Sequence, residues 1–229
     1  MSEWWTYRPS DFLLFSPQTY YRLFELYNID IWPMQVVSLA LCTAIITLAV
    51  RNPAWQGRAI SAILASCWLW VAAAYLLQHY STINWAARYF AIGFTIEAIL
   101  LIWYGIIRDR LLFRSVEPAC QRAGIGVFLF ALVFQPFIAP LVGREWIQAE
   151  IFGVAPDPTV TATLGLLLLA DNKPHWLLMI IPFIWCTISG VTLWTMKSPD
   201  FFITPLAALL VLGLAAWKVF MLPKQYSEK

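Results

Sequence analysis

The chain has 229 residues, of which 61% are hydrophobic and 12% charged, and its mean hydropathy is +0.69. Soluble domains carry about 25% charged residues, so this composition excludes an ordinary soluble domain and is typical of a polytopic membrane protein. The formal net charge of only +2 gives no reason to expect a nucleic-acid partner.

The cysteine pattern and the first residues of the chain add further exclusions. The cysteines Cys42, Cys67, Cys120 and Cys186 form no C-x-x-C pair, so we expect neither a disulfide framework nor a thiolate metal site. No basic region followed by an apolar one opens the sequence, so we expect no cleavable signal peptide. We also expect no lipidation and no cofactor.

Residues 1–32 are predicted to form an N-terminal segment built around an amphipathic helix. Ser16 and Pro17 suit the cap and the first position of a helix. An apolar stripe follows at helical spacing and consists of Tyr20, Leu23, Phe24 and Tyr27. Such a helix is expected to lie in the membrane interface; a soluble cap packed on the membrane spans is the alternative.

Residues 33–222 form the predicted membrane domain, and residues 223–229 form a C-terminal tail. A bilayer crossing needs about 20 apolar residues for a hydrocarbon core of about 30 Å. The expected spans are, in order, Pro33–Val50, Ala59–Tyr80, Ala86–Ile107, Ala123–Val142, Pro158–Ala170, Trp176–Met196 and Phe201–Leu222. The predicted fold class is therefore an all-α polytopic membrane bundle of about seven helices, one of them short.

The short span decides the topology. We expect it to begin with Asp157 as its cap and Pro158 at its first position, and its length of about 20 Å is small for a full crossing. If the arginine-rich loop 108–122 is cytoplasmic, the C-terminal lysines share that side only when the short helix crosses. The charge distribution thus favours seven crossings over a re-entrant helix, with the N-terminus outside and the C-terminus inside.

Short sequences spread along nearly the whole chain occur in a distinctive order. They are Tyr27-Asn28, Ile31-Trp32-Pro33-Met34-Gln35, Ile83-Asn84, the stretch from Phe152 to Thr159, the stretch from Leu164 to Leu168, and Ile181-Pro182-Phe183-Ile184-Trp185. Together they resemble a bacterial family of small multi-span membrane proteins known only as a domain of unknown function. The resemblance implies a fold and a bacterial inner-membrane location, but no activity.

Two positions depart from the pattern that the chain resembles. In that pattern a cysteine often stands between the two prolines, and a histidine often follows the glycine that ends the fourth span. Here Asp157 and Arg144 occupy these places, so the resemblance implies no thiol or imidazole chemistry in this chain.

Glu97, at the middle of the third span, is the strongest functional signal. A charged carboxylate at that depth costs about 2.5–3.5 kcal/mol, so its side chain is expected to face other helices or a wet cavity. It is either a titratable or cation-binding group or a polar contact that locks helices together. Tyr104 on the same helix face could donate to it, and Gln135 of the next span lies at a similar depth.

The start of the short helix is the second signal. Transporters place broken helices so that their free N–H groups and positive dipole end face an anionic group. Thr159 adds a hydroxyl near that end, whereas Asp157 as cap would weaken the attraction for an anion. An ordinary folded outer loop is the alternative for this region.

The two histidines are not expected to form a haem site. His79 and His175 stand at span ends on opposite sides of the predicted membrane, whereas the axial ligands of one haem face each other across a bundle. The sequence also lacks the phosphate-binding, zinc and hydrolase motifs, so we expect neither a bound metal nor an enzyme.

The sequence is best explained by a permease for a small solute or ion. Its site would lie between the third span, the fourth span and the short helix, with Glu97 as the titratable group and Gln135 as a neutral ligand. Tyr104, Asp157 and Thr159 would be further contacts. The alternative is a non-catalytic accessory or assembly subunit of a larger membrane complex. The expected partners are the lipid bilayer, a small solute or ion, and either membrane subunits or a second copy of the chain.

Overall fold

The computed structural model of the chain describes residues 15–113, 117–170 and 175–227. The predictions that fall on the remaining residues lie outside this range. They concern the start of the N-terminal segment, the middle of the arginine-rich loop and the last two residues of the tail.

The described residues form helices and no strands, which confirms the all-α fold class. The helices are α1 (Pro17–Asp30), α2 (Met34–Arg51), α3 (Gln56–Trp70), η3 (Val71–His79), η4 (Tyr80–Thr82), α4 (Ala87–Leu101), η5 (Ile102–Ile107), α5 (Pro118–Leu129), η6 (Phe130–Phe134), α6 (Gln135–Leu141), η7 (Trp146–Gln148), α7 (Pro156–Leu169), α8 (Trp176–Thr195) and α9 (Ile203–Ser227). The segments η3, η5 and η6 are π-helical continuations of the helices before them.

Within the described residues, five helical stretches are long and apolar enough to cross a membrane, namely Met34–Arg51, Gln56–Thr82, Ala87–Ile107, Pro118–Leu141 and Trp176–Thr195. Their outer faces expose large apolar side chains, such as Leu39 on α2 and Ile99 on α4. Extended apolar surface of this kind is suited to lipid and not to water. The fold is that of a membrane protein, whereas the number of seven crossings and the orientation stay predictions.

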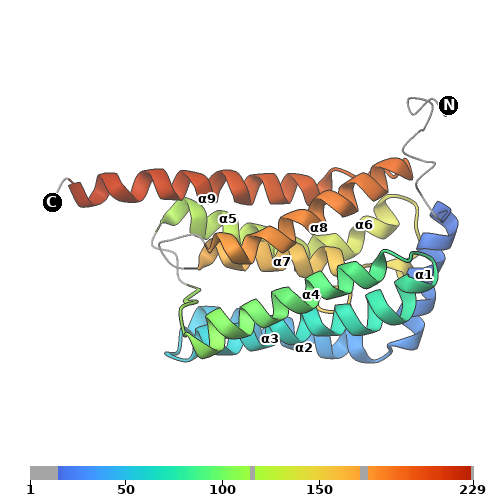
Figure 1. Cartoon of the computed structure of the whole chain (residues 1–229), viewed down its shortest axis with the longest axis horizontal. Coiled ribbons are helices and arrows are strands. Elements are labelled where there is room, and N and C mark those ends of the chain that lie inside the picture. The colour runs from blue at the N-terminus through green and yellow to red at the C-terminus, as the bar shows by residue number, and fades with distance from the viewer. Residues whose placement is uncertain (1–14, 114–116, 171–174, 228–229) are drawn as a thin grey trace.

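The helices from α2 to α9 lie side by side along one direction, and α1 crosses one end of this bundle (Figure 1). Helix α7 starts at the α1 end, where the Tyr27 hydroxyl donates to the Val154 carbonyl at 2.7 Å. It ends towards the opposite side, where Lys218 of α9 donates to the Ala170 carbonyl at 3.1 Å. Helix α7 therefore runs from the α1 end towards the other end of the bundle, and its 14 residues extend about 21 Å.

Helix α7 is the centre of the fold, because all of its residues from Pro156 to Leu169 are buried. A helix that is apolar on every side is expected to be surrounded by other helices. The closest neighbour is α5, where Gly124 and Gly165 bring the two backbones together. A methyl group added at Gly124 would lie 2.8 Å from the Gly165 carbonyl oxygen, and one at Gly165 would lie 2.7 Å from the Phe128 nitrogen. Small residues allow such close helix contacts in membranes.

Both ends of α7 are buried, so their backbone groups need partners inside the protein. At the start, Pro156 and Pro158 carry no N–H. The Thr159 hydroxyl accepts from the Gly153 N–H at 2.8 Å and donates to the Ala155 carbonyl at 2.6 Å. At the end, the Lys218 ammonium, only 2% exposed, binds a terminal carbonyl and complements the negative end of the helix dipole.

The predicted boundaries of two helices are wrong. Helix α7 begins at Pro156, and its cap position is Ala155, which makes no side-chain cap hydrogen bond. Asp157 lies inside the first turn and is not the cap, because its carboxylate is directed towards donors on α8. Helix α9 continues to Ser227, beyond the predicted end at Leu222.

Helix α1 begins where the sequence predicts, with the Ser16 hydroxyl accepting from the Thr19 N–H. Its apolar stripe is buried against the bundle, and the Phe24 and Tyr75 rings stack with centroids 5.1 Å apart. The stripe therefore contacts protein, as the alternative of a packed cap implies. The location of α1 in the membrane interface stays a prediction.

We expect Gly165→Ala to destabilise the protein by about 1–3 kcal/mol, because the added methyl group would overlap the α5 backbone. The unfolding midpoint of the detergent-solubilised protein measures this effect. Gly126→Ala is the matched control on α5, since a methyl group there meets no described atom within 4 Å. Equal midpoints for the two variants would contradict the close approach of α5 and α7.

Candidate functional site

A small cavity of about 20 Å³ lies at the N-terminal end of α7. Its lining combines side chains of α6, the segment 142–155, α7, α8 and the start of α9, namely Gln135, Ile138, Ala139, Arg144, Glu150, Asp157, Leu193, Asp200, Ile203 and Thr204. The volume has room for about one water molecule. We call this space the α7 cavity.

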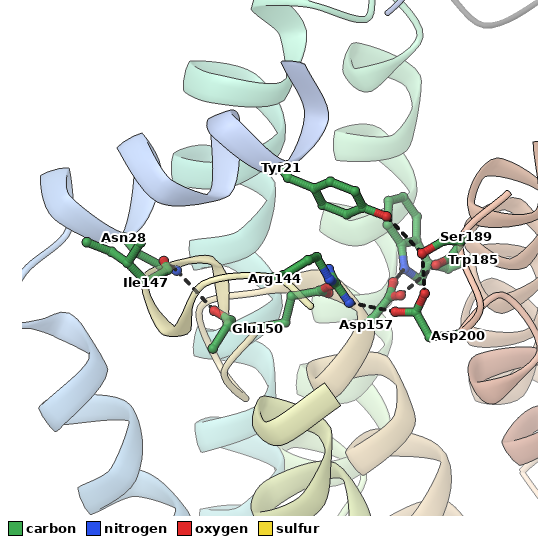
Figure 2. Close-up of polar contacts among 11 residues, drawn as sticks. Tyr21, Asn28, Arg144, Ile147, Glu150, Asp157, Trp185, Ser189 and Asp200 are labelled. Carbon is green, nitrogen blue, oxygen red and sulfur yellow. Dashed lines mark hydrogen bonds and ion pairs between the residues drawn. The ribbon is translucent and has the colours of Figure 1, made fainter. Parts of the chain in front are cut away.

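A buried ion pair forms one wall of the α7 cavity (Figure 2). Arg144 lies 2.6 Å from Asp200, and both side chains are 7% exposed. Arg144 also lies 3.7 Å from Glu150, and its guanidinium group stacks on the Tyr21 ring of α1 at 4.7 Å. The Tyr21 hydroxyl in turn hydrogen-bonds Ser198, which donates to Asp200. Helix α1 thereby contacts the ion pair that lines the cavity.

Asp157 is held by neutral donors of α8. The Trp185 indole N–H donates to one carboxylate oxygen at 2.7 Å, and the Ser189 hydroxyl donates to the other at 2.5 Å. Hydrogen bonds to both oxygens favour the ionised carboxylate. Asp157 therefore makes contacts suited to an anion although it is almost completely buried.

The cavity carries more acid than base, since three carboxyl groups surround a single guanidinium. Burial raises the pKa of the Glu150 carboxyl well above its usual range, the Asp157 charge raises it further, and Arg144 lowers it. Glu150 thus binds a proton more readily than an exposed glutamate does.

Several polar atoms around the α7 cavity have no hydrogen-bond partner among the described residues. They are Gln135 Oε1, Arg144 Nε and Nη1, Glu150 Oε2 and Thr204 Oγ1. Buried polar groups in folded proteins nearly always have partners. A ligand the size of a water molecule in this space could pair with these donors and acceptors, so the α7 cavity has the properties of a site for a very small ligand.

A metal ion does not fit this site. Across residues 15–113, 117–170 and 175–227, no three His, Cys, Asp or Glu side chains are grouped so that they could hold a metal ion. The guanidinium of Arg144 in the cavity wall would also repel a cation.

Glu97, the predicted titratable group, is fully buried on α4. Neither of its carboxyl oxygens has a hydrogen-bond partner in the part of the chain that the structure describes. It is not among the residues that line the α7 cavity. One helical turn away, Phe94 packs edge-on against Trp185 with ring centroids 5.0 Å apart, and Trp185 binds Asp157.

Tyr104 does not donate to Glu97, so that expectation is wrong. Tyr104 lies in the π-helical segment η5 at the end of the α4 helix, and its ring centroid is 6.1 Å from that of His175. His79, by contrast, lies at the α1 end, where its Nε2 is 3.1 Å from Asp30. The two histidines therefore lie at opposite ends of the bundle, whereas their location on opposite sides of the membrane stays a prediction.

The structure brings two of the predicted site residues together, since Gln135 and Asp157 both line the α7 cavity. Thr159 lies two residues further along α7 and binds backbone groups. The sequence did not indicate that Asp200 pairs with Arg144 across 56 residues. The only local signal was a group of charged residues beside apolar segments, which is also typical of exposed loops.

The sequence profile of a family of unknown function, DUF6064, matches residues 17–225. The chain belongs to the DUF6064 family. No curated protein and no solved structure is significantly similar to it. Membership confirms the resemblance to a domain of unknown function and assigns no activity to this DUF6064 protein.

We expect Arg144→Gln to destabilise this DUF6064 protein by about 3–5 kcal/mol, because it would leave buried carboxylates without their counter-charge. Arg58→Gln is the control, since the Arg58–Asp109 pair is largely exposed and should contribute at most about 1 kcal/mol. Unfolding midpoints in detergent measure both effects. A cost for Arg144→Gln no larger than that for Arg58→Gln would contradict the proposed role of this ion pair.

The raised pKa of Glu150 predicts a pH dependence of stability. The stabilisation that protonated Glu150 gives the folded state is fully present below the pKa of a glutamate in the unfolded chain, about 4.3. This stabilisation is lost as the pH rises through the higher pKa of Glu150 in the folded state. Glu150→Gln should therefore match the wild type at low pH and become more stable than it at alkaline pH. Unfolding midpoints measured across this range test the sign. A variant that is less stable at alkaline pH would show that pairing with Arg144 outweighs burial.

Proposed function

We propose that this DUF6064 protein is a membrane permease for a small ion or solute, with its site at the N-terminal end of α7. The observation that supports this most directly is the α7 cavity, where unpaired buried atoms and an excess of carboxyl groups meet inside an apolar helix bundle. A purely architectural polar cluster would be expected to satisfy its own donors and acceptors.

The way in which α7 is placed supports the same proposal. Ionisable residues inside membrane bundles are costly and generally mark pathways for ions or substrates. Transporters commonly build their sites at the ends of interrupted helices near the middle of the bilayer. Helix α7 is short and starts with Pro156 and Pro158 beside Asp157, so its N-terminal end resembles such a helix end in length and composition.

The size of the cavity favours an ion over a larger solute. A space of about 20 Å³ accepts a water-sized species, and anything larger requires the cover to move. That cover is α1, through Tyr21 on Arg144 and through Asn28, whose side-chain amide donates to the carbonyls of Ile147 and Ala149. We infer that α1 and the segment 142–155 together control access from their end of the bundle.

Glu97 provides a second buried carboxyl deeper in the bundle. The Phe94 ring, one turn from Glu97, packs against Trp185, which binds Asp157. We place the protein in a bacterial inner membrane, with the N-terminus outside and the C-terminus inside, on the basis of the family resemblance and the distribution of Lys and Arg.

Reconstitution into proteoliposomes tests the proposal. We expect the wild type to dissipate an imposed ion or pH gradient, and Glu97→Gln and Gln135→Leu each to reduce that flux at least tenfold. Glu145→Gln is the control, because Glu145 is exposed in the segment next to the cavity. Wild-type flux in Glu97→Gln would remove Glu97 from the pathway. No wild-type flux of protons, alkali cations or small anions would contradict a permease.

A second candidate is an accessory subunit of a membrane complex, which an apolar groove between α5 and α9 favours. This groove of about 550 Å³ is lined by Ala123, Gly126, Val127, Phe130, Phe202, Ile203, Leu206, Ala207 and Leu210. Either acyl chains or a partner helix could fill it. Mass spectrometry of the protein in gentle detergent would distinguish a stoichiometric partner from bound lipid, and only the former supports this function.

A further inference from the structure

We propose that the ion of this site is the proton, bound reversibly at Glu150 Oε2 and exchanged with a single water molecule in the α7 cavity. The inference rests on the proposed permease function and deepens it, since it names the species that the site takes.

The contacts single out Glu150 among the acidic groups of the cavity. Asp200 is paired with the Arg144 guanidinium at 2.6 Å, and Asp157 accepts from Trp185 and Ser189. The ion pair of Glu150 with Arg144 is longer, at 3.7 Å through Oε1. Its other oxygen, Oε2, is buried and unpaired among the described residues.

The neighbouring side chains complete a site for one water molecule. Gln135 and Thr204 are only 5% and 3% exposed, both line the cavity, and each leaves an oxygen without a partner among the described residues. A buried water molecule needs about two to four polar partners. It can accept from Arg144 Nη1 and donate to Gln135 Oε1 and Glu150 Oε2.

The electrostatic surroundings of Glu150 favour proton uptake. Arg144 attracts its negative charge, whereas Asp157 on α7 and Asp200 before α9 repel it. The tyrosines that face it are Tyr20 and Tyr21 on α1 and Tyr75 in η3. Protonation forms an O–H bond at Oε2 and removes one negative charge, and the water that supplies the proton regains one from solution.

Other occupants fit less well. A metal cation lacks a sufficient group of acidic or imidazole ligands among the described residues and would face the guanidinium of Arg144. An anion would meet three carboxyl groups against one positive charge. A proton needs neither additional ligands nor additional volume.

Infrared difference spectroscopy of the full chain in lipid, recorded over a pH titration, tests the proposal. We expect a component of the protonated-carboxyl band that disappears at alkaline pH in the wild type, persists in Glu145→Gln, and is lost in Glu150→Gln. A wild type without a titrating band, or a Glu150→Gln variant that keeps it, would overturn the assignment.

Two further measurements keep the result decisive. If Glu150→Gln does not fold, Thr204→Val should displace the midpoint of the band, whereas Thr187→Val, at an exposed position on α8, should leave it unchanged; no displacement by Thr204→Val would count against the site. Proton flux in proteoliposomes separates the two proposals. A titrating band at Glu150 without proton flux supports the proton site and contradicts the permease. Proton flux that persists in Glu150→Gln supports the permease and contradicts the proton site at Glu150.

Discussion

The burial of α7 is the constraint on which the rest of the structure depends. A helix of 14 residues is shorter than the hydrocarbon core of a bilayer, so its free backbone groups cannot reach the water on both sides. Each end therefore needs partners from the protein, and the chain supplies them by different means. Two prolines and a threonine hydroxyl reduce the unpaired donors at the start, and the Lys218 ammonium binds a carbonyl at the end.

The α7 cavity is a consequence of this arrangement. The segment 142–155 leads to the buried start of α7, and the side chains of Arg144 and Glu150 in this segment are therefore largely buried as well. Helix α1 then closes the site from outside, because Tyr21 stacks on the guanidinium and Tyr27 binds the Val154 carbonyl. The acidic excess inside this enclosure is what distinguishes it from a satisfied structural cluster.

The sequence predicts much of the fold, because apolar run length and helix-start residues are local properties. The all-α class, the capped start of α1 at Ser16 and the short α7 follow from such local signals. The site is less predictable. Asp157 has the residue type and position of a helix cap, but donors on α8, 28 and 32 residues away, decide its direction. The Arg144–Asp200 pair depends in the same way on which loops meet in space.

The contact between Gly124 and Gly165 has a mechanical consequence. Because backbone touches backbone there, no side-chain rotamer can absorb a shift of one helix along the other. Helices α5 and α7 are thus expected to move together. In the proposed permease, this pair would form the fixed wall of the site, and a change in access would involve the crosswise helix α1 and the turn that leads into α9.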